Sequence, residues 1–192
     1  MTSEARLVER LRTGDSSAFR ELVETYKRRL FTLAYDLCGN IHEAEDISQE
    51  AFIRVFQGIE KFRGDAKLSS WLYRIVVNLS FDRRRKKSLA AMELRESFEG
   101  NEHHPALPAA AAEADPERMT EAGMIRRHLR RALAELSPQQ RTIFVLRHDH
   151  DMKISDISEV LNLADGTVKS QLFRALQRLQ RKLAFYRADF KG

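Results

Sequence analysis

The chain of 192 residues has little cysteine, proline or glycine, and each shortage excludes a class of structure. One cysteine, Cys38, excludes an internal disulfide and a zinc site built from several cysteines. Four prolines and eight glycines favour long helices over turn-rich β structure. No apolar run approaches the roughly 18–20 residues of a transmembrane helix, and the polar N-terminus lacks a signal-peptide core. The expectation is a helical, cytoplasmic protein.

Charge is plentiful and unevenly placed. The net charge of +5 is the sum of four segment charges: −3 over 1–60, +7 over 61–87, −6 over 88–125 and +7 over 126–192. Two basic blocks beside an acidic spacer suit a protein that contacts a polyanion in two places. A solvated helix face is the ordinary explanation of any one such run.

The acidic spacer has the composition of a linker. Three of the four prolines, Pro105, Pro108 and Pro116, lie in it, and large apolar residues are scarce. Proline at that density interrupts helices, and a segment poor in apolar residues cannot build a core. The sequence therefore predicts a first domain over 1–87, a flexible linker over 88–120 and a second domain over 121–192.

Apolar residues recur every three or four positions through both domains, which is the period of amphipathic helices. In the first domain Asp15 or Ser16 is placed to cap the helix that follows Gly14, and Ser69 or Ser70 to cap the fourth helix. The expected helices lie near 7–11, at about 16–38 and 42–59, and from 69 into the basic run 83–87.

The second domain has its own start signals. Ser137 and Pro138 suit the N-cap and first position of a helix, and Gln140 completes a capping box. A short helix follows over 154–161, then a tight turn, and Gly166 opens the last helix. No segment shows a strand pattern, so we predict an all-α fold of two small helical domains.

A short helix, a tight turn and a second helix have the spacing of a helix-turn-helix. Lysine and arginine neutralise phosphates, and arginine and glutamine bond base edges in the major groove. An αα-hairpin with a solvated basic face is the plainer interpretation, and the basic opening of the last helix favours DNA binding. The outward face of that helix carries Lys169, Ser170, Gln171, Arg174, Gln177, Arg178 and Arg181.

Three motifs resemble bacterial sigma factors. The recognition helix of their region four resembles Asp-Gly-Thr-Val-Lys-Ser-Gln-Leu-Phe-Arg-Ala at 165–175. The polymerase-binding helix of region two is similar to Asp-Ile-Ser-Gln-Glu-Ala-Phe-Ile-Arg-Val-Phe at 46–56, and the promoter-melting part resembles 62–65 with 71–78. With two domains only, the chain is similar to the extracytoplasmic-function group of the sigma-70 family.

The resemblance implies a protein that binds core RNA polymerase and promoter DNA and is held inactive by an anti-sigma factor. It assigns polymerase binding to Asp46, Gln49, Glu50, Ile53 and Arg54. It assigns capture of the −10 element to Phe62, Arg63, Lys67, Trp71, Arg74 and Asn78, and reading of the −35 element to Lys169, Ser170, Phe173 and Arg174, beside which we place Arg178. Core packing competes with DNA contact as the role of Trp71 and of Phe173.

Two other functions are considered. A free-standing helix-turn-helix repressor or activator needs a dimer interface, and the sequence offers no heptad zipper. An enzyme such as a nuclease needs a carboxylate cluster, a Cys/His set or a glycine phosphate loop, and we find none. His148 and His150 are interpreted as surface histidines, so we expect no metal and no cofactor.

Overall fold

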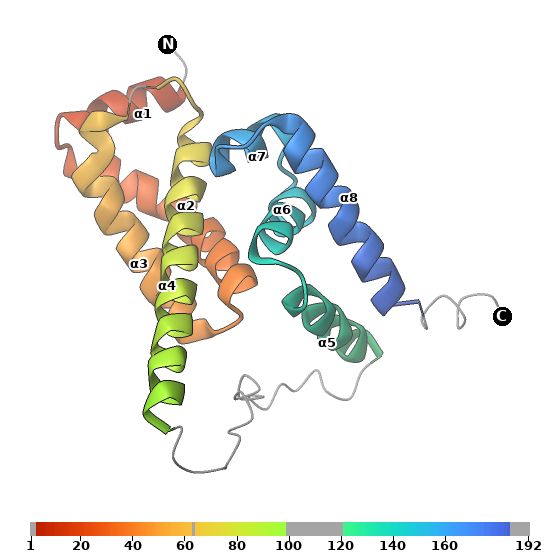
Figure 1. Cartoon of the computed structure of the whole chain (residues 1–192). Coiled ribbons are helices and arrows are strands. Elements are labelled where there is room, and N and C mark those ends of the chain that lie inside the picture. Colours follow the sequence, from red (N-terminus) through yellow and green to blue (C-terminus); the bar gives the residue numbers. More distant parts are fainter. Residues whose placement is uncertain (1–2, 63, 99–120, 185–192) are drawn as a thin grey trace. The chain divides into compact units, whose positions relative to one another are not determined.

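A computed structural model describes residues 3–62, 64–98 and 121–184, and within these ranges the regular elements are helices, with no strand (Figure 1). The all-α prediction is confirmed. The chain divides into two compact units, one of residues 1–101 with 155–162 and the other of residues 102–154 with 163–192. Among the described helices none is long and apolar enough to cross a bilayer.

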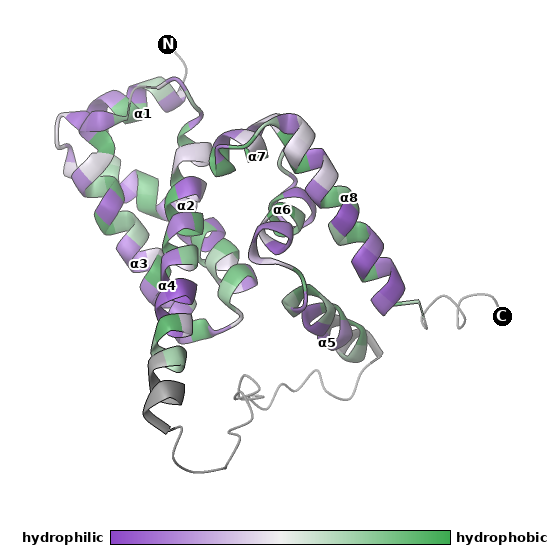
Figure 2. Cartoon of the chain, viewed as in Figure 1, coloured by the Kyte–Doolittle hydropathy of each residue, from purple (hydrophilic) through white to green (hydrophobic). Residues whose placement is uncertain are grey.

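Helix α2 (Ser16–Cys38) is the centre of the first unit. It packs against α1 (Ser3–Arg12), α3 (Ile41–Gly58) and α4 (Leu68–Phe98). Its leucines at 22, 30 and 33 are fully buried. Hydrophobic residues recur along the helix between hydrophilic ones, as the alternating colours of Figure 2 show. The long amphipathic helix predicted here is therefore confirmed.

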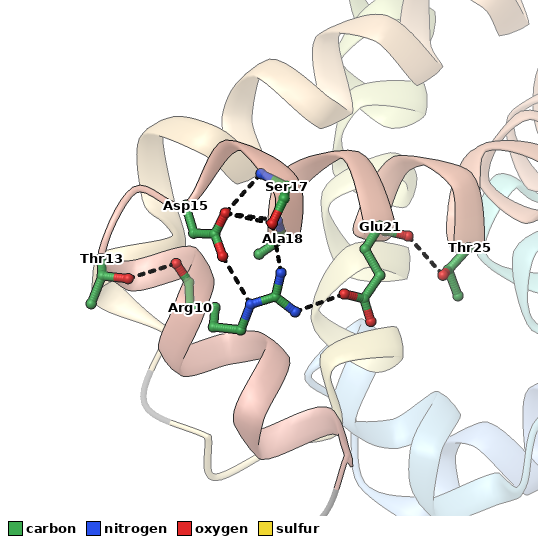
Figure 3. Close-up of polar contacts among 7 residues, drawn as sticks. All are labelled: Arg10, Thr13, Asp15, Ser17, Ala18, Glu21 and Thr25. Carbon is green, nitrogen blue, oxygen red and sulfur yellow. Dashed lines mark hydrogen bonds and ion pairs between the residues drawn. The ribbon is translucent and has the colours of Figure 1, made fainter.

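The corner between α1 and α2 is held by a polar network around Asp15 (Figure 3). The Asp15 carboxylate accepts hydrogen bonds from the backbone N–H groups of Ser17 at 2.8 Å and Ala18 at 3.3 Å, and so caps α2 as predicted. Arg10 donates to Asp15 at 2.8 Å and to Glu21 at 2.9 Å. The Ser17 hydroxyl and the Arg10 guanidinium hold the pKa of Asp15 well below its usual range.

Helix α3 (Ile41–Gly58) begins where the backbone turns back after α2. Gly39 adopts the left-handed conformation with φ 75°, which suits glycine, and Asn40 accepts from the Glu43 N–H at 2.9 Å as the N-cap. The predicted inward stripe is confirmed, and its buried members are Ala44, Ile47, Ala51 and Val55.

Helix α4 (Leu68–Phe98) has a cap that the sequence did not reveal. The expectation that Ser69 or Ser70 caps it is wrong, because both serines lie inside the helix. Instead the Leu68 N–H donates to a carboxylate oxygen of Glu4 at 2.8 Å. A side chain of α1 therefore supplies the acceptor that the first turn of α4 lacks.

Helix α4 also continues through 88–98, which the sequence analysis placed in the linker. This stretch is rich in alanine, leucine, methionine and glutamate and contains neither glycine nor proline. These residues favour helix and nothing in the stretch interrupts it. The rest of the predicted linker, 99–120, lies outside the described residues.

In the second unit α5 (Glu121–Ala134) and α6 (Pro138–His148) both pack against α8 (Asp165–Lys182). Helix α7 (Ile154–Leu161) falls almost wholly within the segment 155–162 that groups with the first unit. Asn162 ends it with φ 53°, a left-handed conformation that asparagine tolerates. The apolar cluster of the second unit comprises Ala132, Leu133, Leu136, Ala175 and Leu179.

The start of α6 confirms half of the predicted capping box. Ser137 accepts from the Gln140 N–H at 3.2 Å, as predicted. The Gln140 side chain does not return to Ser137 but bonds Gln171 and Arg178 on α8. The second half of the box is therefore wrong, because partners on another helix compete for the amide.

The Asp15 network predicts a pH-dependent contribution to stability. A carboxyl whose pKa is lowered by folding stabilises the protein above its unfolded pKa of about 4, and this contribution is lost as the pH falls towards the folded pKa. Asp15→Asn keeps an oxygen that caps α2 but loses the charge, so its deficit in melting temperature should shrink between pH 7 and pH 3. Asp15→Ala also loses the cap and should melt below Asp15→Asn at both values. Thermal unfolding followed by circular dichroism tests this, and a deficit of Asp15→Asn that does not change with pH would contradict it.

Candidate functional site

One side of α3 presents apolar residues to solvent. Ile53 is 50% exposed and Phe56 is 64% exposed, and with the exposed Gln49 they form what we name the α3 face. These positions are four and three residues apart, so they share one side of the helix. Sequence reasoning missed Phe56, although the same spacing identifies it. Large apolar side chains beside polar ones are typical of a protein-binding surface.

The α3 face is flanked by charged pairs. A carboxylate oxygen of Asp46 lies 2.9 Å from a guanidinium nitrogen of Arg83 on α4, and Glu50 lies 3.0 Å from Arg54. The structure thus pairs two predicted polymerase-binding residues, Glu50 and Arg54, with each other. The Asp46 side chain remains 62% exposed. Exposed pairs of this kind contribute little to stability, which leaves these charges available for a partner.

A hollow of about 360 Å³ lies beside the exposed Phe56. Leu11 and Phe19 contribute to its lining. The rings of Phe19 and Phe56 meet edge to face, with their centroids 5.4 Å apart. The α3 face therefore adjoins a partly apolar depression formed by the corner of α1 and α2.

The segment between α3 and α4 is anchored at both ends by α1. Phe62 ends the short 3-10 helix η1 (Ile59–Lys61), and its carbonyl accepts a hydrogen bond from the Arg12 guanidinium. At the other end the Leu68 N–H donates to Glu4. Gly64 between them has φ 81°, a conformation that favours glycine. We name residues 62–68 the anchored loop, of which Arg63 lies outside the described residues.

The predicted −10 residues differ in their exposure. Phe62 is only 5% exposed and packs against Trp71, with ring centroids 5.2 Å apart. Trp71 and Arg74 are half-buried, whereas Lys67 and Asn78 are exposed. Base stacking requires an accessible ring, so in this conformation Phe62 supports the loop from within the core. Trp71, Arg74 and Asn78 recur at helical spacing and share one side of α4.

The exposed side of α8 follows from the stripe that the helix buries. Val168, Ala175 and Leu179 are buried. The predicted contact residues on the opposite side are exposed, and Phe173 is 62% exposed, so its ring is not part of the core. The residues brought together on this side are Lys169, Ser170, Phe173 and Arg174.

Arg178, the fifth predicted DNA-binding residue of α8, is exposed but already has a partner. Its guanidinium donates to the side-chain oxygen of Gln140 at 3.2 Å. The nitrogen of the same Gln140 amide donates to the side-chain oxygen of Gln171 at 3.1 Å. Two residues of the basic face are therefore connected through one side chain of α6.

The described histidines and the cysteine show no arrangement typical of a metal site. Within 3–62, 64–98 and 121–184 no three potential ligands gather in a group. The His148 ring lies against Phe144, with centroids 4.7 Å apart. Cys38 is half-buried, and burial raises the pKa of its thiol, which disfavours the reactive thiolate.

Comparisons with known proteins identify the family to which the chain belongs. The models of Sigma-70 region 2 and Sigma-70, region 4 match residues 22–90 and 126–179. The chain is 34% identical to the ECF RNA polymerase sigma factor SigW of Bacillus subtilis, over 92% of this chain and 94% of that protein. It is 30% identical to the ECF RNA polymerase sigma-E factor of Escherichia coli, over 92% of each chain.

Solved structures show the same fold. CnrH in complex with the cytosolic domain of CnrY aligns with a TM-score of 0.68 at 20% identity, over 95% of this chain and 98% of that one. The sigma factor RpoE of Bartonella quintana, in complex with the anti-sigma factor NepR, aligns with a TM-score of 0.66 at 24% identity, over 86% of this chain and 96% of that one.

The fold and the two matched segments define a sigma-type transcription factor. The chain belongs to the extracytoplasmic-function (ECF) sigma factors of RNA polymerase, and it acts in promoter-directed transcription initiation. Its relatives are initiation factors and not catalysts.

The different burial of Phe62 and Phe173 can be tested by comparing the stability of two alanine variants. Phe62→Ala removes a buried ring and should lower the free energy of unfolding by about 3–5 kcal/mol. Phe173→Ala removes an exposed ring and should change it by no more than about 0.5 kcal/mol. Denaturant unfolding of both variants measures the difference, and equal losses would contradict the assignment of the two rings.

Proposed function

We propose that the chain recruits core RNA polymerase through the α3 face, reads a −35 element with α8 and captures an unpaired base of the −10 element at the anchored loop. The observation that carries the proposal is the exposed row of Lys169, Ser170, Phe173 and Arg174, positioned by a buried stripe. Residues 1–87 then act as region two and 121–192 as region four, joined through 88–120. Because polymerase and chromosome are its partners, the protein acts in the cytoplasm.

Polymerase docking is assigned to α3 because it offers apolar area and accessible charge together. Ile53 and Phe56 supply the area, and Asp46, Glu50 and Arg54 supply a charged rim. Interfaces of this composition bury their apolar centre and leave the polar rim accessible to solvent. Gln49 completes the set on the same side of the helix.

Promoter melting is assigned to the anchored loop together with α4. Stacking and hydrogen bonding of a flipped base each offset part of the unstacking cost, which is a few kcal/mol. Of the predicted residues there, Lys67 and Asn78 are exposed, and Trp71 and Arg74 are half-buried. The Lys67 ammonium lies 2.9 Å from a carboxylate oxygen of Asp156, and the Arg74 guanidinium donates to the Glu159 carbonyl, so DNA would have to replace these partners. No nucleotide hydrolysis is required for capture of this kind.

An anti-sigma factor is the proposed regulator. The sigma factor RpoE of the same fold has been solved in complex with the anti-sigma factor NepR, and CnrH, also of this fold, in complex with the cytosolic domain of CnrY. An inhibitor that covers the α3 face prevents polymerase binding, because both partners then need the same apolar residues.

Substitution of Ile53 tests polymerase docking. Ile53→Asp places a charge in the centre of the α3 face and should weaken binding to core polymerase by on the order of tenfold or more. Ile41→Asp is the matched control, since Ile41 is 40% exposed on the same helix but outside this face. Affinity for core polymerase, measured with a labelled chain, should fall only in the first variant. Equal affinities of the two variants would contradict the assignment of polymerase docking to the α3 face.

Substitution of Arg174 tests reading of the −35 element. Arg174→Ala should reduce transcription from promoters selected by the wild-type holoenzyme by roughly tenfold or more, while core binding persists. Arg181→Ala removes the same charge from the same helix outside the proposed contact row and serves as control. A loss of polymerase binding in Arg174→Ala, or equal effects of both variants, would show that the roles of the two domains are wrongly divided.

A further inference from the structure

Gln140 is the buried polar residue that connects α6 with the basic face of α8. It is only 6% exposed, although glutamine is usually a surface residue. Its side chain bonds Gln171 at 3.1 Å and Arg178 at 3.2 Å, which are seven residues apart and therefore two turns apart on α8. Arg174, the proposed base-reading arginine, lies on the turn between them.

The chemistry of arginine fixes the direction of these hydrogen bonds. A guanidinium has donors and no acceptor, so the Gln140 oxygen must face Arg178. The Gln140 nitrogen therefore faces Gln171, and it can only donate. The Gln171 oxygen must then accept, which leaves the NH2 group of Gln171 as the group available to a ligand. Arg178, which can only donate, thus fixes the orientation of the Gln140 amide, and Gln140 in turn fixes that of the Gln171 amide.

We propose that Gln140 is a positioning residue for promoter reading, which fixes Gln171 so that its NH2 group and not its oxygen is presented to the major groove. The inference rests on the proposed role of α8 at the −35 element. An NH2 group requires an acceptor, and guanine and thymine carry only acceptors among their hydrogen-bonding groups in the major groove, whereas cytosine carries only a donor. The base that Gln171 contacts should therefore be guanine or thymine in preference to cytosine.

The variant Gln140→Glu reverses this polarity. A carboxylate still accepts from Arg178, but it has no hydrogen to donate to Gln171. Gln171 must then turn its NH2 group towards residue 140 and present its oxygen outwards. Gln140→Met removes both hydrogen-bonding groups at similar volume and leaves Gln171 without a fixed orientation. Gln139→Glu makes the same change of charge at the neighbouring position and is the matched control.

The experiment selects promoters from a library with a randomised −35 region, using holoenzyme assembled from core polymerase and each full-length variant. At one base-pair position Gln140→Glu should shift the ratio of guanine plus thymine to cytosine by at least threefold towards cytosine. Gln140→Met should flatten the preference at the same position, and Gln139→Glu should keep the wild-type profile. Thermal unfolding of each variant verifies that the second domain is folded, and Gln140→Met still tests the orientation if Gln140→Glu does not fold.

Two results would overturn the inference. In the first, Gln140→Glu keeps the wild-type base preference at every −35 position. In the second, Gln139→Glu shifts the preference as much as Gln140→Glu does, which would show an effect of charge alone. Failure of the proposed function is distinguishable. If the wild-type holoenzyme enriches no −35 sequence, or if Arg174→Ala leaves the enriched sequence unchanged, then α8 does not read the promoter. If Arg174→Ala abolishes the enrichment and Gln140→Glu leaves the profile unchanged, only the role of Gln140 is lost.

Discussion

Burial of one apolar stripe per helix is the constraint that determines what this protein presents to its partners. On α8 the burial of Val168 and Ala175 leaves Arg174 on the outer side. On α3 the burial of Ile47 and Val55 leaves Ile53 exposed. A helix that must bury every third or fourth residue has no freedom to rotate, so a sequence that specifies a core also specifies the surface opposite. The surfaces proposed for recognition in both domains are therefore a consequence of packing.

Most of the fold could be predicted because its signals are local. Helical periodicity, the asparagine and glycine between α2 and α3, and the Asp15 cap act within a few residues of the chain. The exposed row on α8 follows from the same periodicity. The length of α4 was missed because the charge and proline content of 88–120 as a whole suggested a linker and outweighed the local helix propensity of 88–98.

What the sequence could not reveal depends on residues far apart in the chain. Glu4 and Leu68 are separated by 64 positions, and no local pattern links them. Gln140 has the spacing of a capping box, but its partners lie 31 and 38 residues away. Phe62 sits in a motif that suggests base stacking, and only the packing against Trp71 shows that its ring is buried. In each case a tertiary contact outweighs a local preference.

The two anchors of the loop between α3 and α4 have a practical consequence for work with shortened chains. Both anchors come from α1, which precedes the matched region 2 segment that begins at residue 22. A chain trimmed to the matched segment keeps every residue of the loop and loses the side chains that hold its ends. The loop would then pay its ordering entropy when DNA binds, at about 1–2 kcal/mol for each residue that has to be fixed. Affinity tags and fusions are for this reason better attached to the carboxyl end. If the loop opens DNA as proposed, α1 contributes to that step although none of its residues is proposed to touch DNA.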